Sequence, residues 1–523
     1  MSDKLGAAAL ERLKEFADIA FDVKTGMSRE ELLATIPDYD ALIVRSGTQV
    51  TADVLAAGQK LRVVGRAGVG VDNIDVNAAT MRGVVVMNTP GANSIATAEL
   101  AIGLMLAVSR NIPQSHASLG AGEWRRGDFV GNQLYRKVLG IIGFGRVGKL
   151  VAERARAFGM DVLVYDPSTL EETARDLGVM LVEMDELLAK SDYVTLHAAL
   201  TPTTTKLINA DTLAQMKDGA VLINAARGKL VDEEALAEAL RSGKLKAAAV
   251  DVYAKEPPPA DNPLLSLPNV VHVPHLGAST YEAERDVGIQ IVGQVVSALR
   301  GADFTYAVNM PFDFEGDFAS VRPYLELAET LGRLHTGLAD KPVCRIEVEV
   351  QGEAVAGLVR AIGAGLLKGL LEPDSDVPVN YINAPLLAHQ RGIETSQTVG
   401  IHTLDYPNLI ACRAMWDGGE RLLAGVLFAG SQPRIVQVDE YALEARPEGV
   451  VLVMQNRDVP GVIGQVGTLL AAYEVNIGEW RLGRNKPGGE ALSFINLDSE
   501  PTEPMLRALH EIKAVTQAKV VKL

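Results

Sequence analysis

The sequence has few cysteines and no long apolar run. Among 523 residues there are 2 cysteines, Cys344 and Cys412, which stand apart and lack the spacing of metal ligands. This predicts no disulfide framework and no metal site, and it favours a reducing compartment. No apolar run reaches the length of a membrane span, and the N-terminus lacks the basic and apolar segments of a signal peptide. We therefore expect a soluble, cytoplasmic protein that does not bind membranes.

Basic residues are also fewer than acidic residues. The chain has 50 Lys and Arg against 66 Asp and Glu, which gives a net charge of −16. This excess of negative charge argues against nucleic acid or an anionic membrane as a partner. An anionic substrate would have to be attracted by a local cluster of arginines. The length predicts three or four domains, because one hydrophobic core rarely extends over so many residues.

The most informative stretch of the sequence runs from Lys137 to Pro167. The apolar run 138–142 predicts a buried strand, and a glycine-rich turn, a helical pattern and a second apolar run, 162–165, follow it. Asp166 ends the second run, 18 residues after the last glycine of the turn. The turn consists of Gly143, Phe144, Gly145, Arg146, Val147 and Gly148.

Each part of this stretch suits a dinucleotide. Gly143 permits a tight turn, Gly145 lets a pyrophosphate approach the backbone, and Gly148 lets the helix pack against the strand. Asp166 is placed to accept hydrogen bonds from ribose hydroxyls and would repel a 2′-phosphate, so NAD is favoured over NADP. The alternative is a structural turn in another α/β protein. The strand, helix and acid in register favour the dinucleotide site.

Four later apolar runs alternate with helical patterns and predict a parallel sheet. They are 193–197, 220–224, 247–251 and 270–274. In such a sheet the carboxyl ends of the strands lie on one edge, where ligands bind. Arg227, Glu256 and His275 each follow one of these ends.

These three residue types match the needs of hydride transfer from a hydroxy acid. Histidine titrates near neutral pH, so His275 can take the hydroxyl proton, and Glu256 can orient and stabilise its imidazole. Arg227 can bind a substrate carboxylate through its forked guanidinium. Taken singly, each residue is more often a structural hydrogen-bonding group, a solvated charge or a salt-bridge partner. Three of them at one edge of a dinucleotide sheet favour the catalytic interpretation.

From Arg45 to Val308 the chain resembles the D-2-hydroxyacid dehydrogenase family. The matching motifs, besides the glycine turn, are Asn224-Ala-Ala-Arg227-Gly, Asp251-Val-Tyr-Ala-Lys-Glu256-Pro and Pro274-His275-Leu-Gly-Ala. Further motifs resemble the branch that oxidises 3-phosphoglycerate on the phosphorylated route to L-serine. They are Val44-Arg45-Ser46, Gly65-Arg66-Ala-Gly-Val-Gly-Val-Asp-Asn73, Met87-Asn-Thr-Pro90, Trp124-Arg125-Arg126 and His275-Leu-Gly-Ala-Ser-Thr280.

The resemblance implies roles for particular residues. The catalytic residues would be Arg227, Glu256 and His275. NAD would be bound by Gly143, Phe144, Gly145, Arg146, Val147, Gly148, Asp166, Ala225, Asp251 and His275. The phosphorylated substrate would be bound by Arg45, Arg66, Val69, Gly70, Asn93, Arg227 and Arg126, the last supplied by a partner subunit. A solvated basic turn is an equal alternative for Arg125 and Arg126.

The sequence departs from the family pattern at three places. His197-Ala198-Ala199 lacks a proline that is usual there, and Lys229 replaces a glycine. The apolar strand with which the family begins would precede Ser2 and is absent. Either the sequence starts after this strand or the strand is lost. We expect the catalytic residues to be intact, since that strand would be an edge or supporting element.

The fold class expected from the resemblance is α/β, with a Rossmann-type nucleotide domain inserted in a flavodoxin-like substrate domain. The substrate domain would comprise residues 1–96 and 280–308, with early strands at 19–23, 41–44 and 61–64, and the NAD domain residues 97–279. Residues 309–445 resemble the intervening α+β domain of the long form of the branch, with a strand at 345–350 and a helix at 354–371. That domain is associated with anion or substrate regulation, and a spacer that packs subunits together is an equal alternative.

Residues 446–523 follow the order strand, helix, strand, strand, helix, strand, which is ferredoxin-like. They resemble an ACT domain, an amino-acid sensor, and Asn456, Asp458 and Asn476 match its ligand positions. The resemblance implies L-serine as effector and a homo-oligomer, with a tetramer favoured; a domain used only for dimerisation is the alternative. For the whole chain, the alternatives are a dehydrogenase of another D-2-hydroxy acid and a dinucleotide-sensing corepressor.

Overall fold

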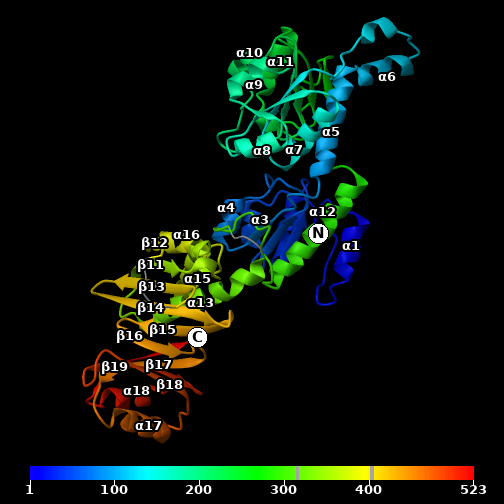
Figure 1. Ribbon diagram of the computed structural model, residues 1–523. Helices are drawn as coiled ribbons and strands as arrows, with labels where there is room; N and C mark the ends of the chain where they lie inside the picture. Colours follow the sequence, from blue (N-terminus) through cyan, green and yellow to red (C-terminus); the bar gives the residue numbers. More distant parts are fainter. Residues whose placement is uncertain (314–316, 401–405) are drawn as a thin grey trace.

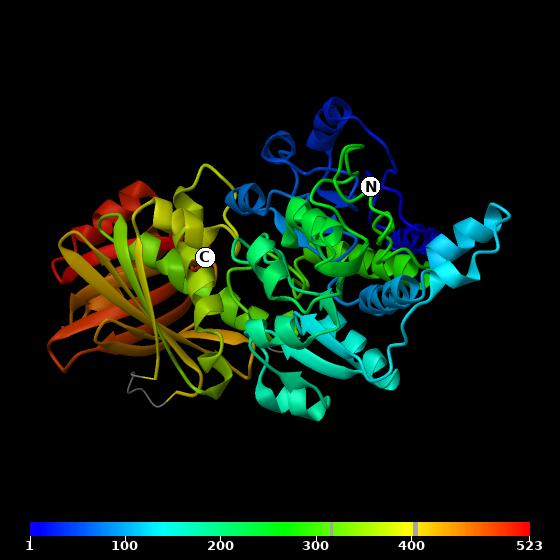
Figure 2. The ribbon, with the colours of Figure 1, turned by 90° about the horizontal axis from the view of Figure 1, so that it is seen from above.

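The chain forms four units in a row, each built around one β-sheet. The computed structural model describes residues 1–313, 317–400 and 406–523. The nucleotide unit lies at one end, followed by the N-terminal unit, the intervening unit and the C-terminal unit (Figure 1). Helix α5 (Ser94–Ser109) leads from the N-terminal unit into the nucleotide unit. In the view from above these two units overlap on one side, and the intervening and C-terminal units lie on the other (Figure 2).

The nucleotide unit contains a seven-stranded sheet in the order β10-β9-β8-β7-β4-β5-β6, in which every neighbouring pair is parallel. From β4 the chain first adds β5 and β6 on one side and then crosses over to add β7 to β10 on the other. Open α/β sheets bind ligands at such a switch point, here between β4 and β7. The strands are β4 (Val138–Ile142), β5 (Asp161–Tyr165), β6 (Met180–Leu181), β7 (Tyr193–Leu196), β8 (Ala220–Asn224), β9 (Leu245–Val250) and β10 (Val270–His272).

Helices cover both faces of this sheet, because its strands are buried, near-continuous apolar runs. They are α5, α7 (Arg146–Ala157), α8 (Glu171–Asp176), α9 (Met184–Lys190), α10 (Ala210–Gln215), α11 (Glu233–Arg241) and the short η3 (Gly228–Leu230). Helix α6 (Ile112–Gly120) and η2 (Arg126–Phe129) form an arm with no buried residue. The Rossmann-type α/β architecture predicted from the sequence is confirmed.

The N-terminal unit has a parallel three-stranded sheet of β1 (Ala41–Val44), β2 (Val63–Arg66) and β3 (Val85–Met87). Helices α1 (Ala7–Lys14) and α12 (Tyr281–Leu299) pack on one face. The other face is covered by α2 (Arg29–Thr35), η1 (Ile36–Asp38), α3 (Ala52–Ala57) and α4 (Val76–Met81). The chain therefore returns to this unit after the nucleotide unit is complete.

The strand predicted at 19–23 is wrong, because these residues lie outside every sheet and are at most half-buried. An isolated extended segment cannot satisfy its backbone groups within a ladder and gains little from β propensity alone. Within the described residues, no single helix is long and apolar enough to cross a membrane. The pair α5 and α6, bent by 62° at its break, has the required length and composition.

The intervening unit has a six-stranded sheet in the order β12-β11-β13-β14-β15-β16. Its strands are β11 (Val343–Gln351), β12 (Glu394–Val399), β13 (Leu409–Trp416), β14 (Gly419–Phe428), β15 (Gln432–Val438) and β16 (Tyr441–Ala445). Its helices are α13 (Phe318–Leu338), α14 (Glu353–Ala356), α15 (Val359–Leu371), η4 (Glu372–Asp374) and α16 (Ala384–Gln390). The helix predicted over 354–371 is thus interrupted, because the chain turns at Gly357 and Leu358 between α14 and α15.

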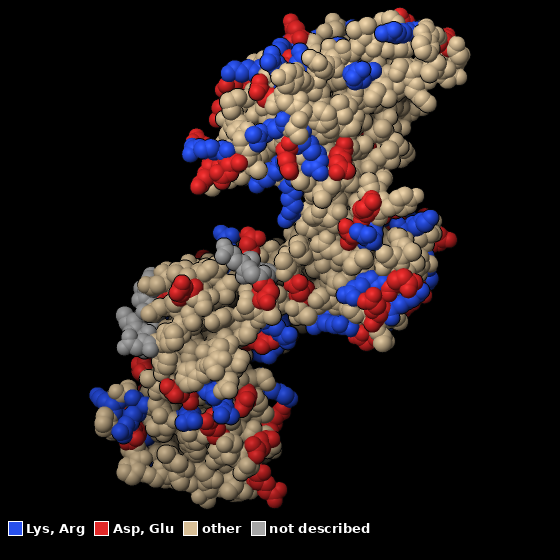
Figure 3. Space-filling view, turned by 45° about the vertical axis from the view of Figure 1, so that its right-hand side comes forward, with Lys and Arg blue, Asp and Glu red and all other residues tan. Residues whose placement is uncertain are grey.

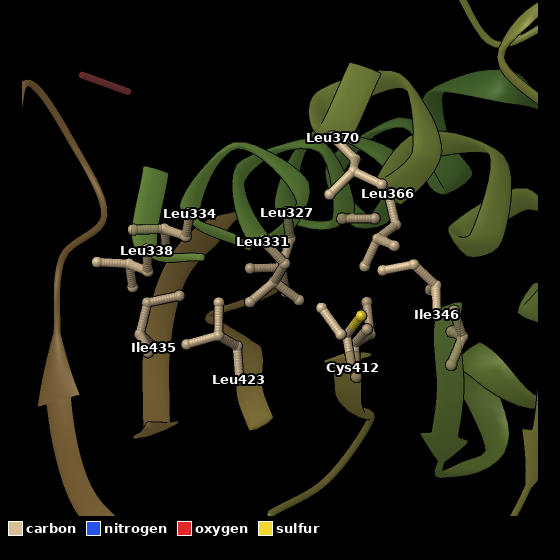
Figure 4. Packing of buried hydrophobic residues seen from close by; sticks show 14 of the residues in the cluster. Leu327, Leu331, Leu334, Leu338, Ile346, Leu366, Leu370, Cys412, Leu423 and Ile435 are labelled. Carbon is tan, nitrogen blue, oxygen red and sulfur yellow. The ribbon is translucent and has the colours of Figure 1, made fainter. Parts of the chain in front are cut away.

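Helices α13 and α15 cross closely above this sheet. A Cβ on Gly369 would lie 1.9 Å from the Glu329 carbonyl oxygen, and one on Gly332 would lie 2.1 Å from that of Leu366, so only glycine allows this approach. Leucines from both helices meet Ile346, Cys412, Leu423 and Ile435 of the sheet (Figure 4).

The C-terminal unit is an antiparallel sheet in the order β18-β19-β17-β20, the ferredoxin-like arrangement. Its elements are β17 (Val450–Arg457), α17 (Val462–Ala472), β18 (Ile477–Arg484), β19 (Glu490–Leu497), α18 (Glu503–His510) and β20 (Val515–Lys522). The two helices cover one face. Val453, Phe494 and Val521 on the other face join the core of the intervening unit, so the two units share one hydrophobic interface.

Candidate active site

A cleft of about 1290 Å³ lies between the nucleotide unit and the N-terminal unit. Figure 3 shows the hollow that separates the uppermost unit from the units below it. The cleft is lined by loops at the carboxyl ends of β2, β4, β8 and β9 and by the amino-terminal parts of α5 and α12. The sequence predicted that these strand ends would gather at one edge, and residues from both units complete the cavity.

The glycine turn forms one wall of the cleft. Gly143 has φ +92°, and a Cβ there would lie 2.5 Å from the Ala198 backbone nitrogen, so the turn requires glycine. A Cβ on Gly148 would lie 2.2 Å from the Gly143 carbonyl oxygen, so α7 can begin this close to β4 only without a side chain there. At Gly145, the N-cap of α7, a Cβ would meet no protein atom within 4 Å. The open space before the helix amino end fits a phosphate group.

Asp166 follows the end of β5 beside this turn. Its carboxylate accepts hydrogen bonds from the Phe144 amide at 2.7 Å, the Ser168 amide at 2.8 Å and the Ser168 hydroxyl at 2.6 Å. Partial burial alone would raise the pKa of Asp166, but these hydrogen bonds and the charge of Lys149 outweigh it and lower the pKa. The carboxylate is therefore held ionised beside the turn. The Phe144 ring itself is buried in the core.

Farther along the same edge of the sheet, after β9 and β10, Glu256 and His275 form a direct pair. Glu256 Oε2 lies 2.6 Å from His275 Nδ1, and Glu256 Oε1 accepts the Tyr253 amide at 3.0 Å. Burial would raise the pKa of Glu256, but the hydrogen bonds from His275 and Tyr253 and the nearby charges of His275 and Arg227 lower it. Glu256 is thus an ionised group that fixes the orientation of the ring, with Nδ1 engaged.

Asp251 lies behind this pair and is fully buried. Its two oxygens accept the amides of Leu276 at 2.5 Å and Gly277 at 3.0 Å, and its carbonyl accepts the His275 amide at 2.8 Å. Burial raises the pKa of Asp251 despite these bonds. The residue lines the cleft, as expected for a cofactor contact, and it also holds the loop that carries His275.

Three arginines face the cavity from different elements. Arg227 Nε donates to Asp72 Oδ2 at 2.9 Å, and Arg45 Nη1 donates to Glu284 Oε1 at 3.1 Å. The Arg66 Nε atom is enclosed without a hydrogen-bond partner among the described residues. Burial, together with the charges of Arg227 and Arg45, lowers the pKa of Arg66 to about 10. Three cations in one cleft repel one another, and such a cluster is chemically suited to an anion.

Most residues predicted for the site line this cleft. Besides those above they are Val69, Gly70, Asn93, Arg146, Val147 and Ala225, whereas Phe144 and Gly148 of the glycine turn do not line it. The side-chain oxygen of Asn93 is buried without a partner among the described residues. Arg126 lies instead on η2, in the exposed arm, and does not line the cleft of its own chain.

The sequence did not indicate Asp72, Glu284 or Asp3 as site residues. Asp72 stands within the motif that contains Arg66, and this position was the available signal. Asp3 accepts the Arg45 amide at 2.6 Å and the Thr48 amide at 3.1 Å, and so holds the loop that carries Arg45. Nothing local in the sequence pairs Asp3 or Glu284 with Arg45, because these contacts span 42 and 239 residues.

The three residues predicted to bind an effector are not brought together in one chain. Asn456 and Asp458 lie at the end of β17, while Asn476 precedes β18 and donates to Asp498 at 2.6 Å beside the start of β17. The length of β17 separates the two places by about 20 Å. The Asn456 side-chain oxygen is buried without a partner among the described residues.

Two family models match the chain. Residues 102–277 match the D-isomer specific 2-hydroxyacid dehydrogenase NAD binding domain, and residues 320–439 match the D-3-phosphoglycerate dehydrogenase intervening domain. The D-3-phosphoglycerate dehydrogenase of Methanocaldococcus jannaschii is 43% identical over 100% of this chain and 99% of its own length. The enzyme of the same name from Bacillus subtilis is 37% identical over 100% and 99%.

Solved structures match more than half of the chain. TT0316 protein from Thermus thermophilus has a TM-score of 0.55 at 36% identity and covers 59% of this chain and 98% of its own. D-Lactate dehydrogenase from Aquifex aeolicus, complexed with NAD and lactic acid, has a TM-score of 0.52 at 27% identity, covering 56% and 91%. A nicotinamide dinucleotide and a small hydroxy acid thus occupy a protein with this fold.

Proposed function

The chain belongs to the D-3-phosphoglycerate dehydrogenase family, and on that premise we propose that it oxidises 3-phospho-D-glycerate to 3-phosphohydroxypyruvate with NAD. This reaction opens the phosphorylated route to L-serine. The observation that supports it most strongly is the meeting of the Glu256–His275 pair with Arg45, Arg66 and Arg227 in one cleft beside the glycine turn.

The residues of the turn fit NAD. The amino end of α7 and the open space at Gly145 would hold the pyrophosphate, and Asp166 would accept the ribose hydroxyls. Bound NAD supplies the acceptor for the hydride that leaves C2 of the substrate. Asp166 has oxygens already committed to Phe144 and Ser168, yet a carboxylate has further lone pairs for a ribose.

His275 acts as the base. Its Nδ1 is held by Glu256, so Nε2 takes the proton of the C2 hydroxyl as that oxygen becomes a carbonyl. The ionised Glu256 stabilises the imidazolium that results. Asp251 keeps the loop in place through the Leu276 and Gly277 amides, and this fixes the position of the ring relative to the cleft.

The arginines orient the substrate. Arg227 would bind the carboxylate next to C2 and polarise the developing carbonyl, while Arg45 and Arg66 would bind the phosphate. The enclosed Arg66 Nε is a donor that a phosphate oxygen would satisfy. In a protein of net charge −16, this cluster is what makes the cleft attractive to a multiply charged anion.

A homo-oligomer, with a tetramer favoured, belongs to the same proposal, as does a place in the cytoplasm. The exposed arm that carries Arg126 and the 82% exposed Trp124 would reach a second subunit and bring Arg126 to its cleft. The C-terminal unit would pair through the edge strand β18. Antiparallel pairing of two copies of β18 over their full length would bring Ile477 of one opposite Arg484 of the other. Within one chain, Arg484 Nη1 lies 3.4 Å from Asp458 Oδ2.

This pairing would join Asn476 of one copy to Asn456 and Asp458 of another and so complete an L-serine site. Inhibition would then require that serine bind one arrangement of the units better than another.

The test is the formation of NADH from 3-phosphoglycerate, with D-glycerate as the control that lacks the phosphate and with L-serine added in parallel. Oxidation of D-glycerate at an equal kcat/KM would refute the phosphate assignment. If serine neither binds nor slows the reaction, the regulatory proposal alone fails.

A further inference from the structure

The ion pairs of the cleft are distributed unevenly. Arg227 is paired with Asp72 and Arg45 with Glu284, whereas Arg66 pairs with no carboxylate of the described residues. Two of the three cations that would receive the substrate are thus already engaged by groups of the protein. A ligand that binds Arg227 or Arg45 has to compete with these carboxylates.

The Arg227–Asp72 pair joins two units across the cleft. Arg227 follows β8 of the nucleotide unit, and Asp72 belongs to the loop after β2 of the N-terminal unit. Gly70 leaves the room for it, because a Cβ there would lie 1.8 Å from Arg227 Nη2 and 2.7 Å from Asp72 Oδ2. The second amino group, Nη1, donates to the Ala226 carbonyl at 2.7 Å, so the guanidinium is held from its own unit as well.

Neither carboxylate would be buried without a partner after leaving its arginine. The Asp72 side chain is 54% exposed and that of Glu284 41% exposed, so each would be hydrated after release. Each also offers its arginine the chemistry of the expected ligand, an oxyanion that accepts N–H donors. Asp72 stands where a carboxylate would bind Arg227, and Glu284 where a phosphate would bind Arg45.

We propose that Asp72 and Glu284 are specificity-determining residues that occupy the places of the two anionic groups of the substrate. Asp72 competes with the substrate carboxylate for Arg227, and Glu284 competes with the phosphate for Arg45. Substrate binding is then an exchange of anions, and only a ligand with both groups replaces both carboxylates. This inference rests on the proposed function, which supplies the carboxylate and the phosphate.

The exchange predicts that each residue acts on one end of the ligand. Removing the charge of Asp72 increases the affinity for every ligand that brings a carboxylate to Arg227. Removing the charge of Glu284 increases the affinity for every ligand that brings a phosphate to Arg45. Because exposed ion pairs are weak, each effect is about two- to fivefold in affinity. The competition applies equally to ground state and transition state, so KM falls while kcat stays the same.

The experiment compares Asp72→Asn and Glu284→Gln with the wild-type chain. Inorganic phosphate serves as the probe of the phosphate end and D-glycerate as the probe of the carboxylate end. Dissociation constants are measured by calorimetry in the presence of NADH, which cannot accept a hydride, so D-glycerate binds without being oxidised. KM and kcat for 3-phosphoglycerate are measured in parallel. Glu282→Gln is the matched control. Glu282 lies in the same first turn of α12 as Glu284 but pairs with no site arginine among the described residues, so its replacement removes the same charge without breaking a pair in the cleft.

The expected result is a crossed pattern. Asp72→Asn lowers the dissociation constant of D-glycerate and leaves that of phosphate unchanged. Glu284→Gln lowers the dissociation constant of phosphate and leaves that of D-glycerate unchanged. Both replacements lower the KM for 3-phosphoglycerate. A lower kcat with a higher KM in Asp72→Asn overturns the inference and makes Asp72 a positioning residue of Arg227. Equal changes in all three variants also overturn it, since they reflect only the net charge.

Failure of the proposed function has a separate signature. A wild-type chain that oxidises D-glycerate as efficiently as 3-phosphoglycerate refutes the substrate assignment. The binding constants of phosphate and D-glycerate still decide, in that case, whether the two carboxylates compete at separate arginines.

Discussion

The contrast between two glycines of the turn gives the sharpest test of how this sequence builds a nucleotide site. In Gly148→Ala the new methyl group would lie 2.2 Å from the Gly143 carbonyl oxygen and 3.4 Å from the Ile141 side chain. The first contact is with backbone, so no rotamer change relieves it, and the start of α7 has to move away from β4 by about 1 Å to regain van der Waals distance. In Gly145→Ala the methyl group meets no protein atom within 4 Å.

The two replacements therefore differ in what they perturb. Because the clash is with backbone, we expect the upper part of the about 1–3 kcal/mol range for overpacking. The better helix propensity of alanine at position 148 offsets at most about 1 kcal/mol, which leaves a net cost of about 1–2 kcal/mol. We expect Gly148→Ala to lower the melting temperature of the nucleotide unit by several degrees, since about 1 kcal/mol corresponds to about 2–4 °C for a unit of this size. It should also weaken NAD binding, because the helix amino end moves. Gly145→Ala should melt like the wild type but bind NAD at least tenfold more weakly, because its methyl group fills the space assigned to the pyrophosphate.

Calorimetric melting and NAD titration separate these effects. An unchanged melting temperature in Gly148→Ala would contradict the packing argument. Unchanged NAD affinity in Gly145→Ala would show that the pyrophosphate binds elsewhere, whatever the result at position 148.

Three further outcomes follow from the site and the core. His275→Asn should lower kcat by about 10²- to 10⁴-fold with little change in melting temperature, and Glu256→Gln should lower it less, because the base remains but loses its ionised partner; initial rates of NADH formation measure both. Arg66→Gln should raise the KM for 3-phosphoglycerate far more than the inhibition constant of D-glycerate, since Arg66 would contact only the phosphate, and equal effects on both ligands would contradict that placement. His335 is fully buried, and its burial lowers its pKa to about 3. Below about pH 6.5 the unfolded chain takes up a proton at this residue that the folded chain does not. The free energy of unfolding should therefore be greatest above about pH 6.5 and fall by up to about 1.4 kcal/mol per pH unit below it. In denaturant unfolding, the free energy of unfolding of His335→Gln should fall less steeply with pH.

The core of the nucleotide unit could be predicted from local pattern because its information is local. Val138–Ile142 and Ala220–Asn224 are strands with the predicted bounds, since buried parallel strands are short apolar runs between turns. The gathering of Arg227, Glu256 and His275 at one edge followed from the handedness of strand crossovers. Local pattern predicted the wrong structure where an element depends on contacts with distant parts of the chain. The segment 19–23 has the composition of a strand but lies in no sheet, and the helix predicted at 354–371 breaks where α14 meets α15.

The sequence by itself determined the fold class, the nucleotide turn with its acid and the residue types that carry the chemistry, because each depends on neighbours in the chain. Only the tertiary structure decided which charges meet. Asp72 reaches Arg227 across 155 residues and Glu284 reaches Arg45 across 239, while Arg66 has no carboxylate partner in the described part of the chain. It also separated Asn476 from Asn456 and Asp458 by the length of a strand. Such pairings depend on how sheets are placed against one another in space, and no periodicity or spacing along the chain records that placement.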